Sequence, residues 1–261
     1  MIISKQDIMK KISSLPPLPD VIKEAIKYLK AGELQKAADE VNKDIILKKK
    51  IEHIVNSAYF GFSKRLTDTR QMFSAMGLEM AKSVILSYMV SLLAPKEWKI
   101  FKNINFEEFQ SAFLASSKEA IILETNEDIY KKYADSIALI PATICLVDEL
   151  LGEKKQEVEL LIESSGLDYG TILKRFTGVS LFELAAVVAK KWEIDKENID
   201  IIKATECKTC KDNKIIPAVL HLEFFYLVSK PQFFELNSFI EFNPKVIEIA
   251  KKNYERKMNE E

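Results

Sequence analysis

The chain has 261 residues, of which 48% are hydrophobic and 30% are charged, a mixture typical of a soluble globular protein and unlike a disordered one. Lysine and arginine total 38 and aspartate and glutamate total 39, so the net charge of −1 gives no overall attraction to nucleic acid or to an anionic membrane. This length suits one large domain or two lobes that share an interface.

Glycine and proline number only 7 and 8, too few for the many tight turns of an all-β fold, so long helices are favoured. Residues 1–11 lack the continuous apolar core of a signal peptide, and the apolar stretch 137–147 is too short to span a bilayer. The chain has three cysteines, an odd number, and a cytoplasmic chain normally keeps its thiols reduced. We therefore expect a cytoplasmic protein that does not insert into membranes.

The first predicted helices lie in the N-terminal third of the chain. Ile22, Ile26 and Leu29 form an apolar stripe at helical spacing. The segment 43–57 reads as a second helix, stopped by Gly61. These patterns predict a compact group of helices at the start of the chain.

A short helix capped by Thr67 or Asp68 is expected to end near Gly77. Pro217 is expected to open a helix over 218–228, and Asn243 with Pro244 to begin a last one. Further stripes step by three and four residues along the chain: Leu78, Ala81, Ile85, Met89 and Leu92; Leu181, Leu184, Ala185, Val188 and Trp192; Val246, Ile249, Ala250 and Tyr254.

The predicted fold class is all-α, a multi-helical bundle of two lobes. We place an N-terminal helical lobe at 1–100, a second helical lobe at 101–210 and C-terminal helices packed on the bundle at 211–261. Residues 206–214 are polar and lack a stripe, so we expect a loop there.

Three motifs of the first lobe resemble those of one family. The run Leu15-Pro16-Pro17-Leu18-Pro19 before a helix resembles the LPxLP opening of HDOD domains, the "HD-related output domain" family. Asn56-Ser57-Ala58-Tyr59-Phe60-Gly61 is similar to that family's NSAxYG segment, and Ala75-Met76-Gly77-Leu78 to its A-x-x-LG element, with Met76 where leucine is commoner. Gly178 to Trp192 resembles a later helix of the family that ends in tryptophan.

This resemblance, which covers residues 10 to roughly 205, implies a helical bundle related to HD phosphohydrolases and a role in bacterial signalling. Because HD phosphohydrolases bind their metal through histidines and aspartates that include an adjacent His-Asp pair, the resemblance raises the question of whether this chain has such ligands. Such a metal lowers the pKa of bound water and clamps the phosphate. This chain has only His53 and His221, and neither is followed by aspartate.

The positions that would carry those ligands differ in this chain. Ile140 and Pro141 lie where relatives can show a G-L-L-H-D-I-G segment, and Ser180 where they can show a histidine. Ala204 and Thr205 lie where they can show a His-His pair. We therefore expect no cofactor, no metal site and no catalytic residue.

The other candidates for chemistry have plainer interpretations. Cys207 and Cys210 form a CxxC that could be half a zinc site or a redox pair, but Cys145 is the only other cysteine, so we expect free thiols in a loop. We expect both histidines to be partly buried. The lysine run 48–50 is expected to be a solvated face, and the alternative is that it binds an acidic partner or a nucleotide phosphate.

Asn56 is interpreted as the residue that satisfies backbone groups at a helix end, in a corner formed with Ser57, Tyr59 and Gly61; the alternative is a surface for a partner. The segment 13–20 is expected to be extended, because residues before proline avoid helical geometry. Leu15 and Leu18 would then fill the seam between the lobes or contact a partner.

Three functions remain open from the sequence. The preferred one is a non-catalytic signalling module that binds another protein, with no nucleic-acid partner. The alternatives are a degenerate HD pocket that binds a nucleotide without cleaving it, and a metal-dependent phosphohydrolase with an unorthodox site. Should Leu15 and Leu18 be core residues, the partner surface is expected among Phe233, Phe234, Phe239 and Phe242.

Overall fold

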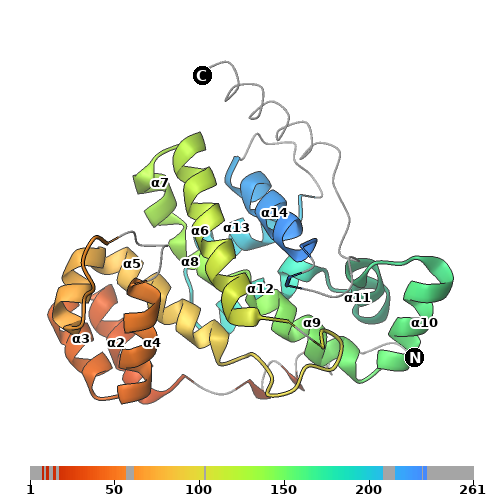
Figure 1. Cartoon of the computed structure of the whole chain (residues 1–261), viewed down its shortest axis with the longest axis horizontal. Coiled ribbons are helices and arrows are strands. Elements are labelled where there is room, and N and C mark those ends of the chain that lie inside the picture. The colour runs from red at the N-terminus through yellow and green to blue at the C-terminus, as the bar shows by residue number, and fades with distance from the viewer. Residues whose placement is uncertain are drawn as a thin grey trace.

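The computed structural model describes residues 8, 10–11, 14–15, 18–56, 62–102, 104–207, 215–230 and 232–233. Throughout these residues the regular structure is helical, with no strand, as the periodicity predicts. The helices at the start of the chain lie at one end of the molecule, and α10 (Lys155–Ser165) and α11 (Tyr169–Thr177) lie at the other (Figure 1). The predicted helix after Asn243 lies outside the described residues.

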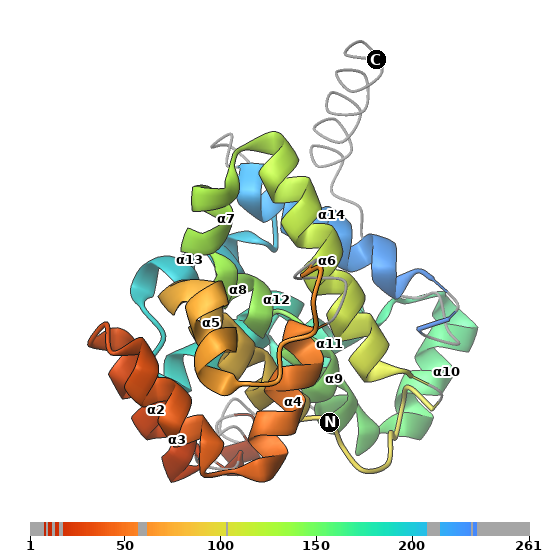
Figure 2. The same ribbon diagram turned by 60° about the vertical axis from the view of Figure 1, so that its left-hand side comes forward.

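The N-terminal group consists of α2 (Asp20–Lys30), α3 (Leu34–Asn42) and α4 (Ile45–Val55). The predicted stripe of α2 is the face that is buried. The helix predicted at 43–57 is α4, which begins later because the Asp44 carboxylate accepts hydrogen bonds from the amides of Ile46 and Leu47. These helices pack on one another and on α5 (Figure 2).

Helix α5 (Thr69–Ser91) connects the two groups of helices and is bent within its length. Asp68 caps it, and Gly77 interrupts it with φ 75° and ψ 178°, a conformation open essentially only to glycine. The predicted end at Gly77 is thus a bend, after which the helix resumes. The second part of α5 packs on α8 (Ala134–Leu139), where the Ser83 hydroxyl donates to the carbonyl of Ala134.

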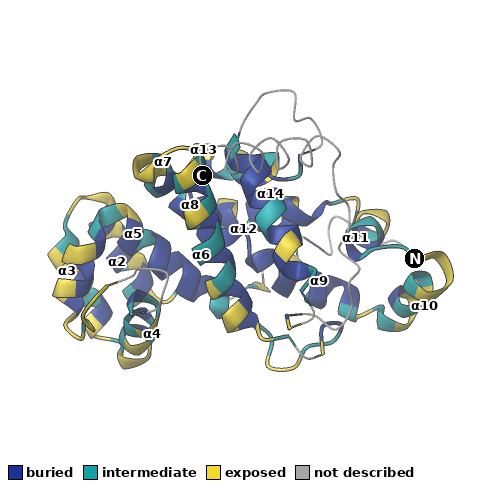
Figure 3. Ribbon diagram, turned by 45° about the horizontal axis from the view of Figure 1, so that its top comes forward, coloured by how far each residue is buried: buried dark blue, intermediate teal, exposed yellow. Residues whose placement is uncertain are grey.

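The second group forms the rest of the bundle: α6 (Phe106–Glu124), α7 (Glu127–Lys132), α8, α9 (Ala142–Gly152), α10, α11, α12 (Leu181–Lys191), α13 (Lys196–Ala204) and α14 (Ile215–Val228). Buried residues gather on α8, α9 and α12, whereas α3 and α10 carry many exposed ones (Figure 3). Helix α14 packs along α6 through Phe109 and Phe224, and it begins two residues before Pro217, which its first turn accommodates. The buried side chains of both groups form one continuous core.

A buried carboxylate holds the segment between α5 and α6 in place. Asp148 on α9 is fully buried and accepts hydrogen bonds from the backbone amides of Lys99, Ile100 and Phe101. A charged acceptor compensates three amides that would otherwise be buried without partners. Asp148 therefore fixes the chain where the first predicted lobe passes into the second.

The segment before α2 differs in part from the prediction that 13–20 is extended. Pro19 is extended, with φ −52° and ψ 141°, but Ser14 is helical and Asp20 already begins α2. The extended prediction was wrong for Ser14 because that residue does not precede a proline; its hydroxyl donates to the carbonyl of Lys11 one turn earlier.

Candidate functional site

Two leucines of the opening motif contact the core. Leu15 and Leu18 are half-buried and pack against it, while Pro19 is exposed and Pro16 lies outside the described residues. The ammonium of Lys191, at the end of α12, donates to the carbonyl of Leu15 over 3.1 Å. This contact links the opening motif to the second group of helices.

The side chain of Asn56 bonds to backbone on both sides of the segment that follows α4. Its Nδ2 donates to the carbonyls of Glu52 and Leu66, each over 2.8 Å, and its Oδ1 accepts from the amide of Leu66 over 2.8 Å. One carboxamide thus joins the end of α4 to the chain ten residues later. Ser57, Tyr59 and Gly61 lie outside the described residues.

The positions compared with HD ligands lie at ends of helices in the second group. Ile140 and Pro141 are buried at the junction of α8 and α9. Ser180 precedes α12 and donates its amide and hydroxyl hydrogens to the carboxylate of Glu183. Thr205 follows α13, is fully buried, and donates its hydroxyl hydrogen to the carbonyl of Ile201.

Some of these helix ends are adjacent in space. The carboxylate of Glu206, after Thr205, accepts a hydrogen bond from the amide of Phe182 in the first turn of α12, over 3.3 Å. Ser180 and Thr205 are therefore brought together by their neighbours. Trp192, the last residue of the later family motif, is buried at the end of α12, where it is part of the core.

These residues do not fit a catalytic divalent metal. They offer an aliphatic side chain, a proline and hydroxyls bonded within the protein, whereas such metals prefer imidazoles and carboxylates. His221 is buried on α14, where its Nδ1 donates to the carbonyl of Thr205 over 2.7 Å, so one histidine alone reaches this region. Nowhere in the described ranges do three histidine, cysteine, aspartate or glutamate side chains form a metal-binding group.

His53 is exposed, and the prediction that it is partly buried was wrong. The buried face of α4 carries Leu47, Ile51 and Val55, which follow one another at intervals of four residues. Position 53 lies two residues from Ile51 and Val55, and therefore on the opposite side of the helix. Its apolar neighbours in sequence are not its neighbours in space.

The two described cysteines, Cys145 and Cys207, are both buried. Burial raises the pKa of the Cys145 thiol well above its ordinary value, so Cys145 is a packing residue with little thiolate. Cys207 contacts the carbonyl of Pro217. Cys210, the second residue of the CxxC, lies outside the described residues.

Phe233, one of the four phenylalanines predicted as an alternative partner surface, does not lie on the surface. Phe233 is buried, with its ring edge-on to that of Phe109, so it presents no exposed face to a partner. The prediction was wrong for Phe233 because α6 and α14 provide an aromatic site that the local sequence does not reveal. Phe234, Phe239 and Phe242 lie outside the described residues.

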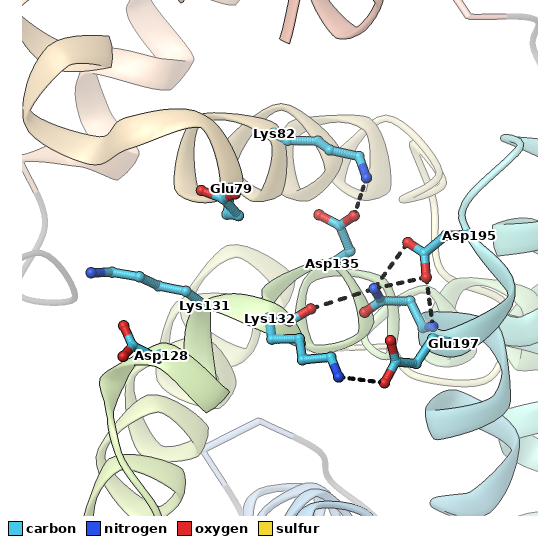
Figure 4. Close-up of a pocket in the computed structure, with 9 residues that line it drawn as sticks. Glu79, Lys82, Asp128, Lys131, Lys132, Asp135, Asp195 and Glu197 are labelled. Atoms are coloured by element: carbon cyan, nitrogen blue, oxygen red, sulfur yellow. Dashed lines mark hydrogen bonds and ion pairs between the residues drawn. The ribbon is translucent and has the colours of Figure 1, made fainter. Parts of the chain in front are cut away.

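A charged cleft of about 540 Å³ lies among α5, α7, α8 and α13, and sequence reasoning did not find it (Figure 4). Its lining residues are Glu79, Lys82, Asp128, Lys131, Lys132, Asp135, Asp195, Glu197 and Asn198. They come from three separate stretches of sequence, 79–82, 128–135 and 195–198, and the charges of each look like an ordinary solvated helix face. Only the fold brings them together.

Lys82 of α5 and Asp135 of α8 form an ion pair on one wall of this cleft, and both side chains are largely buried (Figure 4). Burial raises the pKa of the Asp135 carboxyl above its ordinary value, and the ammonium of Lys82 only partly opposes this. The carboxylates of Asp195 and Glu79 raise that pKa further. The cleft thus has an excess of negative charge around a buried carboxylate.

Asn198 lines the cleft and connects α8 with α13 through its side chain. Its Oδ1 accepts from the amide and hydroxyl of Ser136, and its Nδ2 donates to the carboxylate of Asp195. The carboxylate of Asp195 also caps α13 by accepting from the amide of Asn198. These bonds hold α8 and α13 together and fix the position of Asp195.

The lining residues of the charged cleft supply charge and hydrogen bonds but include no serine, cysteine or histidine to act as a nucleophile or base.

None of the described helices is both long enough and apolar enough to cross a membrane.

Solved structures with similar folds come from bacteria. An HDOD domain protein with unknown function from Geobacter sulfurreducens is 16% identical, covers 95% of this chain and 87% of its own, and has a TM-score of 0.71. A protein from Shewanella amazonensis SB2B, provisionally named a metal-dependent phosphohydrolase, is 14% identical with a TM-score of 0.62, covering 95% of this chain and 88% of its own. At these identities the similarity shows the fold alone.

Among curated proteins, none is similar enough in sequence to count as a match. The model of the HDOD domain, by contrast, matches residues 15–207, which include the motifs at Leu15, Asn56, Gly77 and Trp192. With well over half of its length matched, this chain belongs to the HDOD domain family.

Proposed function

We propose that this protein is a non-catalytic regulatory module of the cytoplasm that acts by binding another signalling protein. The observation that carries the proposal is that Ile140, Pro141, Ser180 and Thr205, at the positions that the resemblance pairs with HD ligands, are buried and engaged in packing or capping. A protein that keeps the core of a fold related to HD phosphohydrolases but lacks the metal ligands has no bound metal with which to activate water. Its surfaces remain available to bind a partner.

A phosphohydrolase activity finds no support in the donor set of this chain. The provisional name of the relative from Shewanella amazonensis SB2B describes that protein, which is 14% identical to this one. Retained activity would require a metal held by other side chains, and the described residues contain no such group.

A bound nucleotide is also less favoured than a protein partner. Phosphates bind where ammonium or guanidinium groups are free to receive them. In the charged cleft, Lys82 pairs with Asp135 and Lys132 pairs with Glu197, while Lys131 pairs with Glu127. A nucleotide phosphate would have to break one of these ion pairs and approach the unpaired carboxylates of the same cleft.

The proposal is tested by affinity capture of the full tagged chain from its native host, followed by mass spectrometry and by reconstitution with the purified candidate. We expect one signalling protein to be recovered in near-stoichiometric amount and to bind in a purified two-component titration. Recovery of the same background proteins with an untagged strain, and nothing further, would contradict the proposal.

A further inference from the structure

A second, more apolar cavity adjoins the charged cleft along helix α13. This second cavity, about 620 Å³ in volume, is lined by Tyr133, Lys196, Glu197, Asp200, Ile201, Ala204, Ile215, Ile216 and Pro217. Glu197 lines both cavities, so the two adjoin at this residue, and we call them together the groove, with the charged cleft as its charged half and the second cavity as its apolar half. We propose that this groove binds a peptide segment of a partner protein in which a lysine or arginine lies next to an apolar residue.

The charged half has carboxylates without cationic partners. Glu79 and Asp128 make no hydrogen bond or ion pair with any described residue, and Asp195 bonds to Asn198 but pairs with no cation there. The three lysines of this half are all committed to ion pairs. A lysine or arginine side chain that enters can pair with one of these carboxylates and displaces no existing pair.

Asp135 shows that this excess negative charge reaches the interior of the cleft. Its carboxylate is nine-tenths buried, and burial disfavours its ionisation most, with smaller contributions from Asp195 and Glu79, although Lys82 is in contact. A bound cation near Glu79 and Asp195 would relieve that repulsion. Glu79, Asp128 and Asp195 themselves are exposed, so solvent and salt weaken their attraction for a cation.

The apolar half explains why the occupant is a peptide and not a small cation. Ile201, Ile216 and Pro217 offer apolar surface beside Glu197, whose carboxylate accepts from the hydroxyl of Tyr133 over 3.0 Å. A polyamine or a divalent ion would leave this surface unused, and nucleic acid would be repelled by the carboxylates. A peptide with a basic and an apolar side chain uses both halves.

The inference rests on the proposed function and is tested with a variant that removes charge and keeps shape. Glu79→Gln, Asp128→Asn and Asp195→Asn are combined in the full chain. Glu79 and Asp128 lose no contact among the described residues, and asparagine at 195 still caps α13. The matched control combines Glu97→Gln, Glu119→Gln and Glu163→Gln, three exposed carboxylates outside both cavities that give the same change in net charge.

The measurement is selection of a displayed library of random 12-residue peptides on the parent chain, followed by fluorescence anisotropy of the enriched peptides. We expect enrichment of peptides with lysine or arginine beside an apolar residue, binding that weakens with added salt, and a loss of about tenfold or more for the cleft variant with no loss for the control. Absence of enrichment, enrichment of peptides without a basic residue, or equal binding by the cleft variant would overturn the inference. So would competition by spermidine or Mg²⁺ alone at the concentration of the peptide.

A second titration separates this inference from the proposed function. A partner captured from the host that binds parent, control and cleft variant equally would leave the regulatory module intact and place its partner site elsewhere. A host that yields no partner would count against the proposed function itself.

Discussion

The carboxamide of Asn56 bonds to both backbone groups of Leu66, donating to its carbonyl and accepting from its amide, each over 2.8 Å. The same side chain donates to the carbonyl of Glu52 in the last turn of α4. A side chain with two donors and an acceptor is needed for all three bonds, which only asparagine or glutamine can supply. Asn56 thus connects the last turn of α4 to Leu66, on the two sides of residues 57–61, which lie outside the described residues.

Replacing Asn56 by alanine should lower the free energy of unfolding by roughly 1–3 kcal/mol, because the Leu66 amide and two carbonyls lose their partner. Thermal and urea melts of variant and parent measure this loss. Asn56→Asp, which keeps an acceptor but no donor, should also be less stable than the parent. An unchanged melting temperature together with lost partner binding would instead assign Asn56 to the interface.

Asp148→Asn should destabilise the fold more than Asn56→Ala does. The variant removes a buried charge that receives three backbone amides, and hydrogen bonds to charged groups are each worth about 1.5–3 kcal/mol. The neighbouring Glu149→Gln is the control, since Glu149 is half-exposed and its ion pairs with Lys11 and Lys99 are worth about 1 kcal/mol or less. Equal urea midpoints for the two variants would contradict this reading of Asp148.

The Lys82–Asp135 pair should respond asymmetrically to substitution. Lys82→Met leaves a buried carboxylate near Glu79 and Asp195 without a cation, and should cost about 3–5 kcal/mol at neutral pH. Asp135→Asn should cost less, because the less buried ammonium of Lys82 can turn into the cleft. Chemical denaturation at pH 7 compares them, and a larger cost for Asp135→Asn would refute the argument.

The same pair predicts a dependence of stability on pH. The pKa of Asp135 is raised in the folded chain, so the folded state binds this proton more tightly than the unfolded one. The stability from this group is therefore fully present below the unfolded pKa, about 4, and is lost as pH rises through the raised folded pKa. In the Lys82→Met variant the deficit relative to the parent should shrink as pH falls towards 4, measured by urea melts in steps of pH. A deficit independent of pH would exclude Asp135 as its source.

The sequence predicted the helices better than it predicted the charged cleft. Apolar periodicity located α2 and α12, and glycine marked the bend of α5 at Gly77, because these features depend on residues within one or two turns. Asp148 had a visible signal, a charge inside the apolar run 144–151, that points to a buried carboxylate. Glu79, Asp128, Asp135 and Asp195 carried none, because their meeting depends on how α5, α7, α8 and α13 pack.

We propose that this protein has the fold of an HD relative without the metal-dependent hydrolysis of HD enzymes. An assay of the purified protein on bis(4-nitrophenyl) phosphate with added Mn²⁺, Fe²⁺ or Mg²⁺ measures this hydrolysis. We predict hydrolysis at the rate of the metal solution alone, because Ile140, Pro141, Ser180 and Thr205 supply neither imidazole nor carboxylate. Metal-dependent turnover that co-elutes with the folded chain through size exclusion, and disappears when the chain is unfolded, would contradict it.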